Sequence, residues 1–462
     1  MTEELSPADR SSLAAEHGPV NMAVGGLLVF DSTPQLTKAM LAERIAQRIH
    51  LLPRLRHRLE EPPLGLANPI WTDDVGFDLD WHLRQASLPR LGGEAELGAF
   101  VGREFSHRLD RSRPLWEATL IEGMQGGRQG LLMKIHHALV DGMAALGMAA
   151  LVLDPGEQPL EIPPAEKQWE PRGYDMRRHI ARLAIRPLAR AQKLMTDQML
   201  RALDPDPRRA AGEMRRATEV ALELARTRPQ APMTALNRPI SPNRRFASAR
   251  GNLQSVKLAS RAAEATVNDT LLAIVAGMLG RYLGSRTEAG GTGPVRVPVA
   301  LVPVSVRATD AETGELGNRI STVFVDLPVD EPDLGARIKA ISAQTRELKE
   351  SAAVRAGALM VGASGWAPPL LSGLLARAMG SVRAFNLVVS NIPGPQQPFY
   401  LSGTRLLEVY PIVPLNPASQ GLAVGIVSYD GLLCFGLLGD RDLDPPLSEA
   451  ADGLAQELAE LS

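Results

Sequence analysis

One stretch, residues 131–151, constrains this chain more than any other part of its sequence. Residues 131–135 are almost entirely apolar, a run typical of a strand, and they lead directly into two adjacent histidines, His136 and His137. An Asp-Gly pair interrupts the chain shortly afterwards, and a run of Ala, Leu and Met typical of a helix follows. The stretch therefore predicts a strand, a turn and a helix, with both histidines at the end of the strand.

The two histidine side chains cannot have the same surroundings. Successive residues of a strand face opposite sides of a sheet, so only one of His136 and His137 can point into a given cleft. A neutral imidazole, with a pKa of about 6.5, can take a proton from a bound hydroxyl or amine and later return it. One histidine is thus predicted to carry chemistry. The alternative is that both are satisfied core residues at a strand end.

The Asp-Gly pair, Asp141 and Gly142, has a predicted supporting role. An aspartate at the start of a helix can cap it or hold a buried cation, which would fix the loop that carries the imidazole. The glycine permits a close approach of the backbone or an unusual dihedral angle.

The spacing His-His-x-x-x-Asp-Gly resembles the signature of the CoA-dependent acyltransferase superfamily, which includes chloramphenicol acetyltransferase, carnitine and plant acyltransferases, and the condensation domains of peptide synthetases. Further segments, in order along nearly the whole chain, resemble the bacterial wax ester synthase/diacylglycerol acyltransferase family. These segments are residues 5–9, 114–116, 267–269, 302–307, 317–321 and 391–395.

Alternating strand and helix patterns predict a layered α/β fold. The resemblance implies more: two chloramphenicol acetyltransferase-like halves that form a pseudo-dimer, with the histidine in a tunnel between them. We expect an N-terminal half at residues 1–154 that carries the motif, a Pro-rich and helical linker at 155–243, and a C-terminal half at 244–462.

The linker contains a basic amphipathic segment. Residues 172–201 hold eight basic and two acidic side chains, and their apolar residues recur at helical spacing. Such a helix can lie on an anionic membrane surface. It can equally be a crossover helix that packs on its own protein and exposes a solvated basic face.

The resembling segments supply the remaining candidate residues. Asn268 and Asp269 open an apolar helix and can serve simply as its N-cap. In the family this Asn-Asp pair borders the active-site channel, where the Asn268 amide would donate a hydrogen bond to the oxyanion formed at the acyl carbonyl. Arg307 is a candidate cation for the carboxylate of the histidine motif. Trp116 and Asn391 are predicted to bind substrate or to support the site.

Composition narrows the chemistry. A net charge of −2 gives no whole-chain case for nucleic-acid binding, and the single cysteine, Cys434, excludes an internal disulfide and a Cys-rich zinc site. The chain has no Gly-x-Ser-x-Gly elbow, so an acyl-enzyme intermediate has little support. We expect no metal and no redox cofactor. Acyl-CoA is the expected co-substrate.

The resemblance then implies an O-acyltransferase that moves a long-chain acyl group from acyl-CoA to diacylglycerol or a fatty alcohol, with His137 as general base. The acidic first residues lack the features of a signal peptide, and no run of about 18 apolar residues occurs, so we expect a cytoplasmic protein that contacts a membrane or lipid droplet only peripherally. Two alternatives remain: a condensation-type enzyme that uses a carrier protein, and a non-catalytic protein of lipid surfaces. A carrier protein is not expected, because the chain has no fused carrier domain. The residues do not decide between triacylglycerol and wax ester as product.

Overall fold

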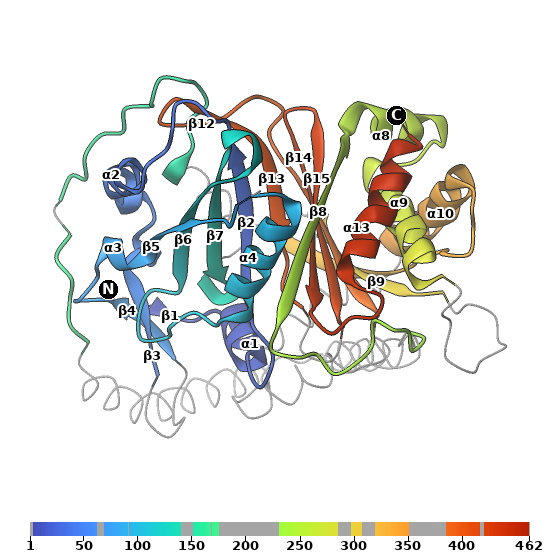
Figure 1. Ribbon diagram of the computed structural model, residues 1–462. Coiled ribbons are helices and arrows are strands. Elements are labelled where there is room, and N and C mark those ends of the chain that lie inside the picture. The colour runs from blue at the N-terminus through green and yellow to red at the C-terminus, as the bar shows by residue number, and fades with distance from the viewer. Residues whose placement is uncertain are drawn as a thin grey trace, which may run out of the picture.

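The chain folds into two α/β halves, each built on a six-stranded sheet, which stand side by side in Figure 1. The computed structural model describes residues 3–61, 69–90, 92–139, 151–167, 169–174, 231–284, 297–306, 319–350, 385–415 and 420–461.

The N-terminal sheet has the strand order β12-β13-β2-β7-β6-β5, and a small sheet with the order β1-β4-β3 lies beside it. The strands of these two sheets are β1 (Glu3–Glu4), β2 (Ala23–Phe30), β3 (His57–Glu60), β4 (Ile70–Asp73), β5 (Leu83–Ser87), β6 (Trp116–Glu122), β7 (Gln129–His136), β12 (Tyr400–Leu401) and β13 (Thr404–Ile412).

The C-terminal sheet has the order β10-β9-β11-β14-β15-β8. Its strands are β8 (Arg244–Asn252), β9 (Val299–Val306), β10 (Arg319–Asp326), β11 (Leu387–Pro393), β14 (Leu422–Tyr429) and β15 (Leu432–Asp440). The described helices are α1 (Pro7–Ala15), α2 (Lys38–Arg48), α3 (Leu79–His82), α4 (Glu94–Ser106), α8 (Leu253–Ala262), α9 (Val267–Leu283), α10 (Leu334–Glu350) and α13 (Leu447–Ala459), and short 3₁₀ turns include η5 (His137–Leu139).

Strand β13 connects the two halves. It belongs to the C-terminal part of the sequence, yet it pairs antiparallel with β2 of the N-terminal sheet, with Ile412 opposite Gly25. Its last residues also cross β15 closely, because a Cβ placed on Gly436 would lie 2.0 Å from the carbonyl oxygen of Pro411. The predicted boundary at residue 244 coincides with the start of β8, whereas residues 400–412 leave their own half for the other sheet.

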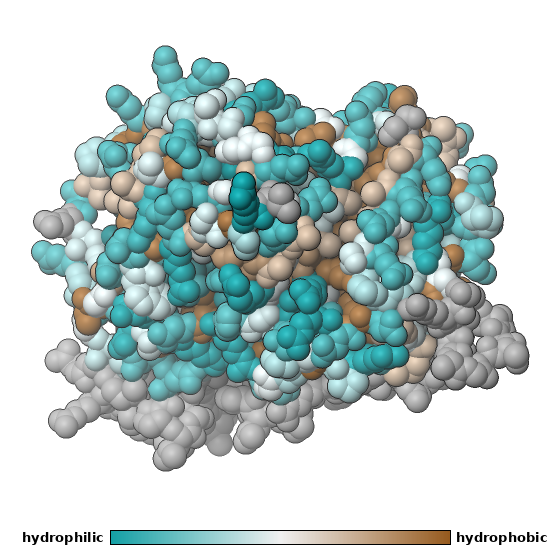
Figure 2. All heavy atoms as spheres, in the orientation of Figure 1, coloured by the Kyte–Doolittle hydropathy of each residue, from teal (hydrophilic) through white to brown (hydrophobic). Residues whose placement is uncertain are grey.

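Helix α4 makes a second connection. It packs on β8, with Gly98 and Gly102 facing the main chain of that strand, and the amide of Arg244 donates to Ser106 Oγ at 2.8 Å. In Figure 2, hydrophilic side chains cover most of the visible face, and hydrophobic residues gather near its middle, between the halves. The halves therefore share a packed seam.

Helix α9 is the core helix of the C-terminal half. Thr266 and Asp269 form a capping box at its start, and apolar residues surround the helix, so that most of its side chains are buried under the sheet, α10 and α13. Among the described residues no single helix is long and apolar enough to cross a membrane; only α8 and α9 taken together, bent by 102°, reach that length and composition.

Strand β7 delivers the histidine motif. All eight of its residues are buried, and it runs between β2 and β6 in the middle of the N-terminal sheet. The Lys134 ammonium donates to the carbonyls of Glu104 and His107 at 2.8 and 2.6 Å, which ties the strand to the end of α4. These contacts fix the strand two residues before His136.

Candidate active site

The strand ends at His136, and the 3₁₀ turn η5 begins at His137. The prediction that the two histidines have different surroundings is confirmed: His136 is 1% exposed, whereas His137 is an exposed residue. The turn reinforces the difference, because His137 no longer follows the pleat of β7. The main-chain amide of His137 still donates to the Met22 carbonyl at 2.9 Å, so the turn remains bound to the chain just before β2.

Both ring nitrogens of His136 face protein groups, one through a hydrogen bond and one through an ion-pair contact. Its Nδ1 accepts a hydrogen bond from the Ala138 amide at 3.0 Å, and its Nε2 lies 3.5 Å from Glu16 Oε2. Because Nδ1 accepts, a neutral His136 carries its proton on Nε2, which faces the carboxylate. His136 therefore holds the turn and has no ring nitrogen facing solvent.

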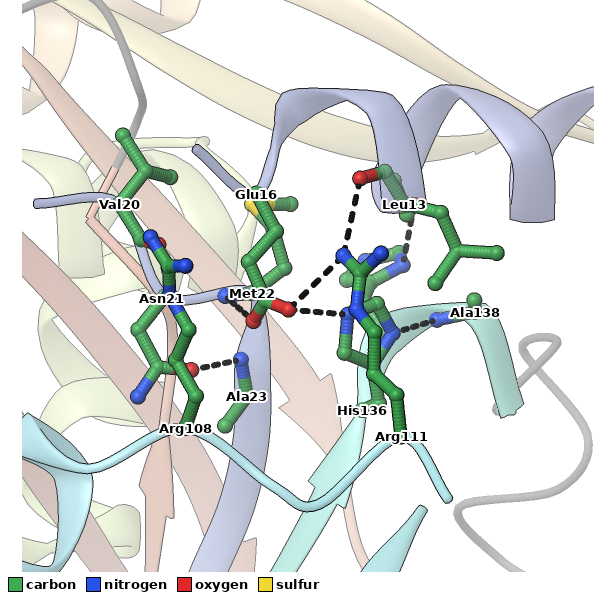
Figure 3. A network of polar contacts seen from close by, with 12 residues as sticks. Leu13, Glu16, Val20, Asn21, Met22, Ala23, Arg108, Arg111, His136 and Ala138 are labelled. Carbon is green, nitrogen blue, oxygen red and sulfur yellow. Dashed lines mark hydrogen bonds and ion pairs between the residues drawn. The ribbon is translucent and has the colours of Figure 1, made fainter. Parts of the chain in front are cut away.

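Glu16 lies at the centre of this network (Figure 3). Its carboxylate, on a side chain that is 1% exposed, accepts from the Met22 amide at 3.1 Å and from Arg111 Nη2 at 3.0 Å. Burial by itself raises the pKa of this carboxyl, but the contacts with His136, Met22 and Arg111 outweigh burial and lower the pKa to about 2. Glu16 is therefore ionised at neutral pH.

The His137 ring contacts helix α1. Its Nδ1 lies 3.4 Å from Ser12 Oγ. Although His137 is an exposed residue, desolvation by the surrounding protein lowers the pKa of its ring, and the neighbouring His136 lowers that pKa further. The lowered pKa favours a neutral His137 at neutral pH, the form that can accept a proton.

Three predicted site residues lie outside the described residues: Asp141, Gly142 and Arg307. Their proposed roles in fixing the turn and pairing across the halves stay predictions.

Trp116 lies in the core of the N-terminal half. Its ring is fully buried and stacks on His82 with 4.5 Å between centroids, and its Nε1 donates to the Leu55 carbonyl at 2.8 Å. These contacts place Trp116 in structural support of β6. His82 is a buried histidine, and its Nδ1 donates to the Trp116 carbonyl at 2.7 Å.

Asn268 and Asn391, far apart in the sequence, come together in the C-terminal half. Asn391 Nδ2 donates to Asn268 Oδ1 at 3.3 Å. Asn391 shares a strand face with Val389, which belongs to the core under α9, so the pair lies on the helix-covered side of the sheet. No described hydrogen bond joins this pair to His137. The assignment of Asn268 as an oxyanion donor stays a prediction.

Asp269 has a structural place. It completes the capping box of α9 and accepts from Thr345 Oγ1 of α10 at 2.8 Å, with 2% of the residue exposed. This contact joins the two helices beside the Asn268 pair.

Sequence reasoning missed three residues of the histidine network: Ser12, Glu16 and Arg111. The 7–15 segment carries helix signals, namely Ser6 and Asp9 around Pro7, which form the capping box of α1. Nothing in the sequence links that helix to a strand end more than 100 residues later, since Ser12 and His137 are 125 positions apart.

Two other chemistries, metal binding and a cysteine nucleophile, would also use His, Cys, Asp or Glu side chains. Among the described residues, no group of three or more His, Cys, Asp or Glu side chains is arranged to hold a metal ion. Cys434 is fully buried, and burial raises the pKa of its thiol to about 11, so it is not a nucleophile at neutral pH.

Known proteins resemble this chain over its whole length. The family model for the wax ester synthase/diacylglycerol acyltransferase catalytic domain matches residues 5–271, and the model for the C-terminal domain of the same family matches residues 316–462. A Mycobacterium bovis protein named as a diacylglycerol O-acyltransferase is 33% identical over 99% of this chain and 90% of its own length. A Mycobacterium tuberculosis protein named likewise is 31% identical over 99% of this chain and 98% of its own.

Solved structures agree. The wax ester synthase/diacylglycerol acyltransferase from Marinobacter aquaeolei VT8 superposes with a TM-score of 0.67 at 28% identity, over 99% of this chain and 98% of that one. The starter condensation domain of rhizomide synthetase, bound to C8-CoA and Leu-SNAC, gives a TM-score of 0.56 at 14% identity, over 100% of this chain and 92% of that one, which shows a shared fold. The chain therefore belongs to the wax ester synthase/diacylglycerol acyltransferase family and is an acyl-CoA-dependent O-acyltransferase.

Proposed function

We propose that His137 is the general base of this acyltransferase. The observation that carries the proposal is the contrast between the two histidines: His137 is an exposed residue, while both ring nitrogens of the buried His136 face other groups of the protein. A base must reach the proton that it abstracts. Of the pair, His137 is the one with a ring nitrogen available to a bound alcohol.

The transfer is direct. His137 takes the proton of the acceptor hydroxyl as that oxygen attacks the thioester carbonyl of acyl-CoA. The new C–O bond forms, the C–S bond breaks, and the imidazolium gives the proton to the departing CoA thiolate. No side chain needs to carry the acyl group. General-base assistance of this kind is worth roughly 10²–10⁴-fold in rate, and holding both substrates beside the ring supplies much of the remainder.

The acceptor is diacylglycerol, a long-chain alcohol, or both. Support for diacylglycerol comes from the relatives with that activity in their names, and support for the alcohol comes from the family description. The alternative that a carrier protein, and not CoA, donates the acyl group is supported only by the similarity to condensation domains. That similarity shows a shared fold alone.

One experiment tests the base and the acceptor together. Radiolabelled palmitoyl-CoA is offered with diacylglycerol and, in parallel, with hexadecanol, to the natural protein and to His137→Ala and His136→Ala variants. We expect His137→Ala to keep its thermal unfolding midpoint and to lose roughly 10²–10⁴-fold in turnover with either acceptor, whereas His136→Ala unfolds at a lower temperature because its ring is buried. Near-native turnover by folded His137→Ala would refute the general base and favour a non-catalytic role for the motif.

We also propose that the protein works at the inner surface of a membrane or on a lipid droplet, because its acceptor and product are apolar. The basic segment 172–201 is the proposed contact; apart from residues 172–174, it lies outside the described residues. The described residues just before it are held on the N-terminal half, where Trp169 packs on Phe77 and lies 4.5 Å from the Arg56 guanidinium. Flotation with phosphatidylglycerol vesicles, and failure to float with phosphatidylcholine vesicles, is the expected result; equal recovery with both would refute an electrostatic surface contact.

A further inference from the structure

We propose that Glu16 and Ser12, one turn apart on or just after helix α1, are positioning residues for the acyl transfer: each contacts one of the two consecutive histidines, and together they fix the turn and the ring orientation of His137. The inference depends on His137 being the base, as proposed above. The first helix would then be part of the catalytic apparatus, although it supplies no reacting atom.

Glu16 holds the turn from both sides of His137. On the N-terminal side its carboxylate faces His136 Nε2, and His136 in turn accepts the Ala138 amide, so the chain on either side of His137 is tied to one ring. On the other side the carboxylate accepts a hydrogen bond from the Met22 amide, and the Met22 carbonyl accepts one from the main-chain amide of His137. Two main-chain hydrogen bonds, the bond from Ala138 to the His136 ring and one ion-pair contact thus connect residues 136–138 to one carboxylate; Figure 3 shows the contacts at Glu16, Met22, His136 and Ala138.

Arg111 keeps that carboxylate in place. Its Nη2 donates to Glu16 Oε2 at 3.0 Å and to the Leu13 carbonyl at 3.2 Å, so the same guanidinium binds the side chain of Glu16 and the last turn of α1. Because the Glu16 side chain is only 1% exposed, its orientation is set by these partners and not by solvent. Removing the charge of Glu16 would therefore directly weaken its contact with His136.

Ser12 acts on the second ring. It lies four residues before Glu16 and therefore on the same side of the helix. Its Oγ is 3.4 Å from His137 Nδ1. A serine hydroxyl at this position can accept a hydrogen bond from Nδ1–H. In this arrangement the proton of the neutral ring is on Nδ1, and Nε2 keeps the lone pair that a general base requires.

The alternative is that Glu16 is one more buried carboxylate that stabilises the fold. Glu457 of α13 provides a matched control: it is 2% exposed, its Oε1 lies 2.8 Å from Arg281 Nε, and it also pairs with Arg337, all within the C-terminal half. Glu16→Gln and Glu457→Gln each replace a buried, arginine-bound carboxylate by an amide of the same size. Ser11, exposed on the same helix, is the control for Ser12.

The experiment measures kcat, KM for palmitoyl-CoA and the unfolding midpoint of Glu16→Gln, Glu457→Gln, Ser12→Ala, Ser12→Thr and Ser11→Ala. We expect both glutamine variants to unfold at lower temperature, but only Glu16→Gln to lose roughly 10–100-fold in kcat, with KM little changed, because a misplaced base slows the chemical step. Ser12→Ala should lose about fivefold in kcat, the worth of one modest hydrogen bond, Ser12→Thr should restore most of it, and Ser11→Ala should match the natural protein.

A spectroscopic measurement separates positioning from stability. In protein labelled with ¹⁵N-histidine, which has eight histidines, the resonances missing from His137→Gln identify His137. We expect these resonances to report the Nδ1–H tautomer in the natural protein and a shift toward Nε2–H in Ser12→Ala. If His137→Ala is inactive but Glu16→Gln keeps the kcat of Glu457→Gln, and the tautomer is unchanged in Ser12→Ala, the positioning role is wrong while the general base stands. If His137→Ala is active, both the general-base proposal and the positioning role are wrong.

Discussion

At the scale of single residues, His82 shows how strongly burial acts on a titratable group. The residue is fully buried between aromatic rings, stacked on Trp116 and, at 5.3 Å, on Phe77. Desolvation is the main cause that lowers the pKa of His82 to about 4, and it outweighs the hydrogen bond to the Trp116 carbonyl. The folded protein therefore binds a proton at His82 more weakly than the unfolded chain does.

This difference predicts a pH dependence of stability. The folded pKa lies below the unfolded value of about 6.5, so the contribution of His82 is fully present above pH 6.5 and is lost as the pH falls toward 4. We expect the free energy of unfolding to fall by about 2 kcal/mol from this group between about pH 7.5 and pH 5. Urea unfolding of His82→Phe, which keeps the stacked ring, should show a correspondingly flatter pH profile. Equal slopes for the two proteins would contradict the assignment.

The sequence pointed to His137, the proposed base, but not to the residues that hold it. Two adjacent histidines at the end of an apolar run were enough to predict that the two rings would not face the same cleft. The partners Glu16 and Ser12 could not be predicted, because a carboxylate that follows a helix and a hydroxyl within it are ordinary features in sequence. Only the packing of α1 against the turn after β7 makes them part of the site.

At the scale of elements, the packing of α4 on β8 depends on two glycines. A Cβ at Gly98 would lie 2.5 Å from the carbonyl oxygen of Phe246, and one at Gly102 would lie 2.6 Å from that of Arg244. Main-chain atoms cannot move aside as a flexible side chain can. The helix of the N-terminal half and the first strand of the C-terminal half therefore touch along their backbones.

We expect Gly102→Ala to destabilise the protein by about 1–3 kcal/mol, because the added methyl group forces the helix and strand apart. Gly156→Ala is the control, since a Cβ there would meet nothing within 4 Å. Thermal unfolding measures both. The expectation fails if the two variants unfold at the same temperature.

Sequence patterns indicated individual strands and turns, but not every pairing between strands. An Asp-Gly pair between two apolar runs, Asp430 and Gly431, is a sequence signal for a hairpin, and β14 and β15 form one; both turn residues have positive φ, 45° and 80°. The partner of β13 was not predictable. A strand with one buried face shows the same alternation of apolar and polar residues in whichever sheet it lies. The position of β13 beside β2 could therefore not be predicted from residues 404–412.

At the scale of the whole molecule, β13 makes the two halves one cooperative unit. The N-terminal sheet takes β12 and β13 from the C-terminal part of the chain, and α4 packs on β8 of the other sheet. Neither half can unfold without exposing the edge or face that the other covers. The two halves are therefore distinct in architecture, but they fold and unfold together.

We accordingly expect one calorimetric transition for the full chain, with a calorimetric enthalpy equal to the van't Hoff enthalpy. Residues 1–154 expressed alone should be aggregated or unfolded, because β2 lacks its partner strand, and should become soluble when co-expressed with residues 244–462. Two separated transitions, or a folded and soluble fragment 1–154, would show that the halves are independent.

The late position of β13 in the sequence also has a consequence during protein synthesis. While the ribosome is still translating the middle of the message, β2 is the bare edge of the N-terminal sheet, and it acquires its neighbour only after residues 404–412 emerge. A bare edge invites pairing with other nascent chains. Fast translation of the second half of the chain, or a chaperone bound to that edge, would shorten or cover the exposure of β2 to wrong partners.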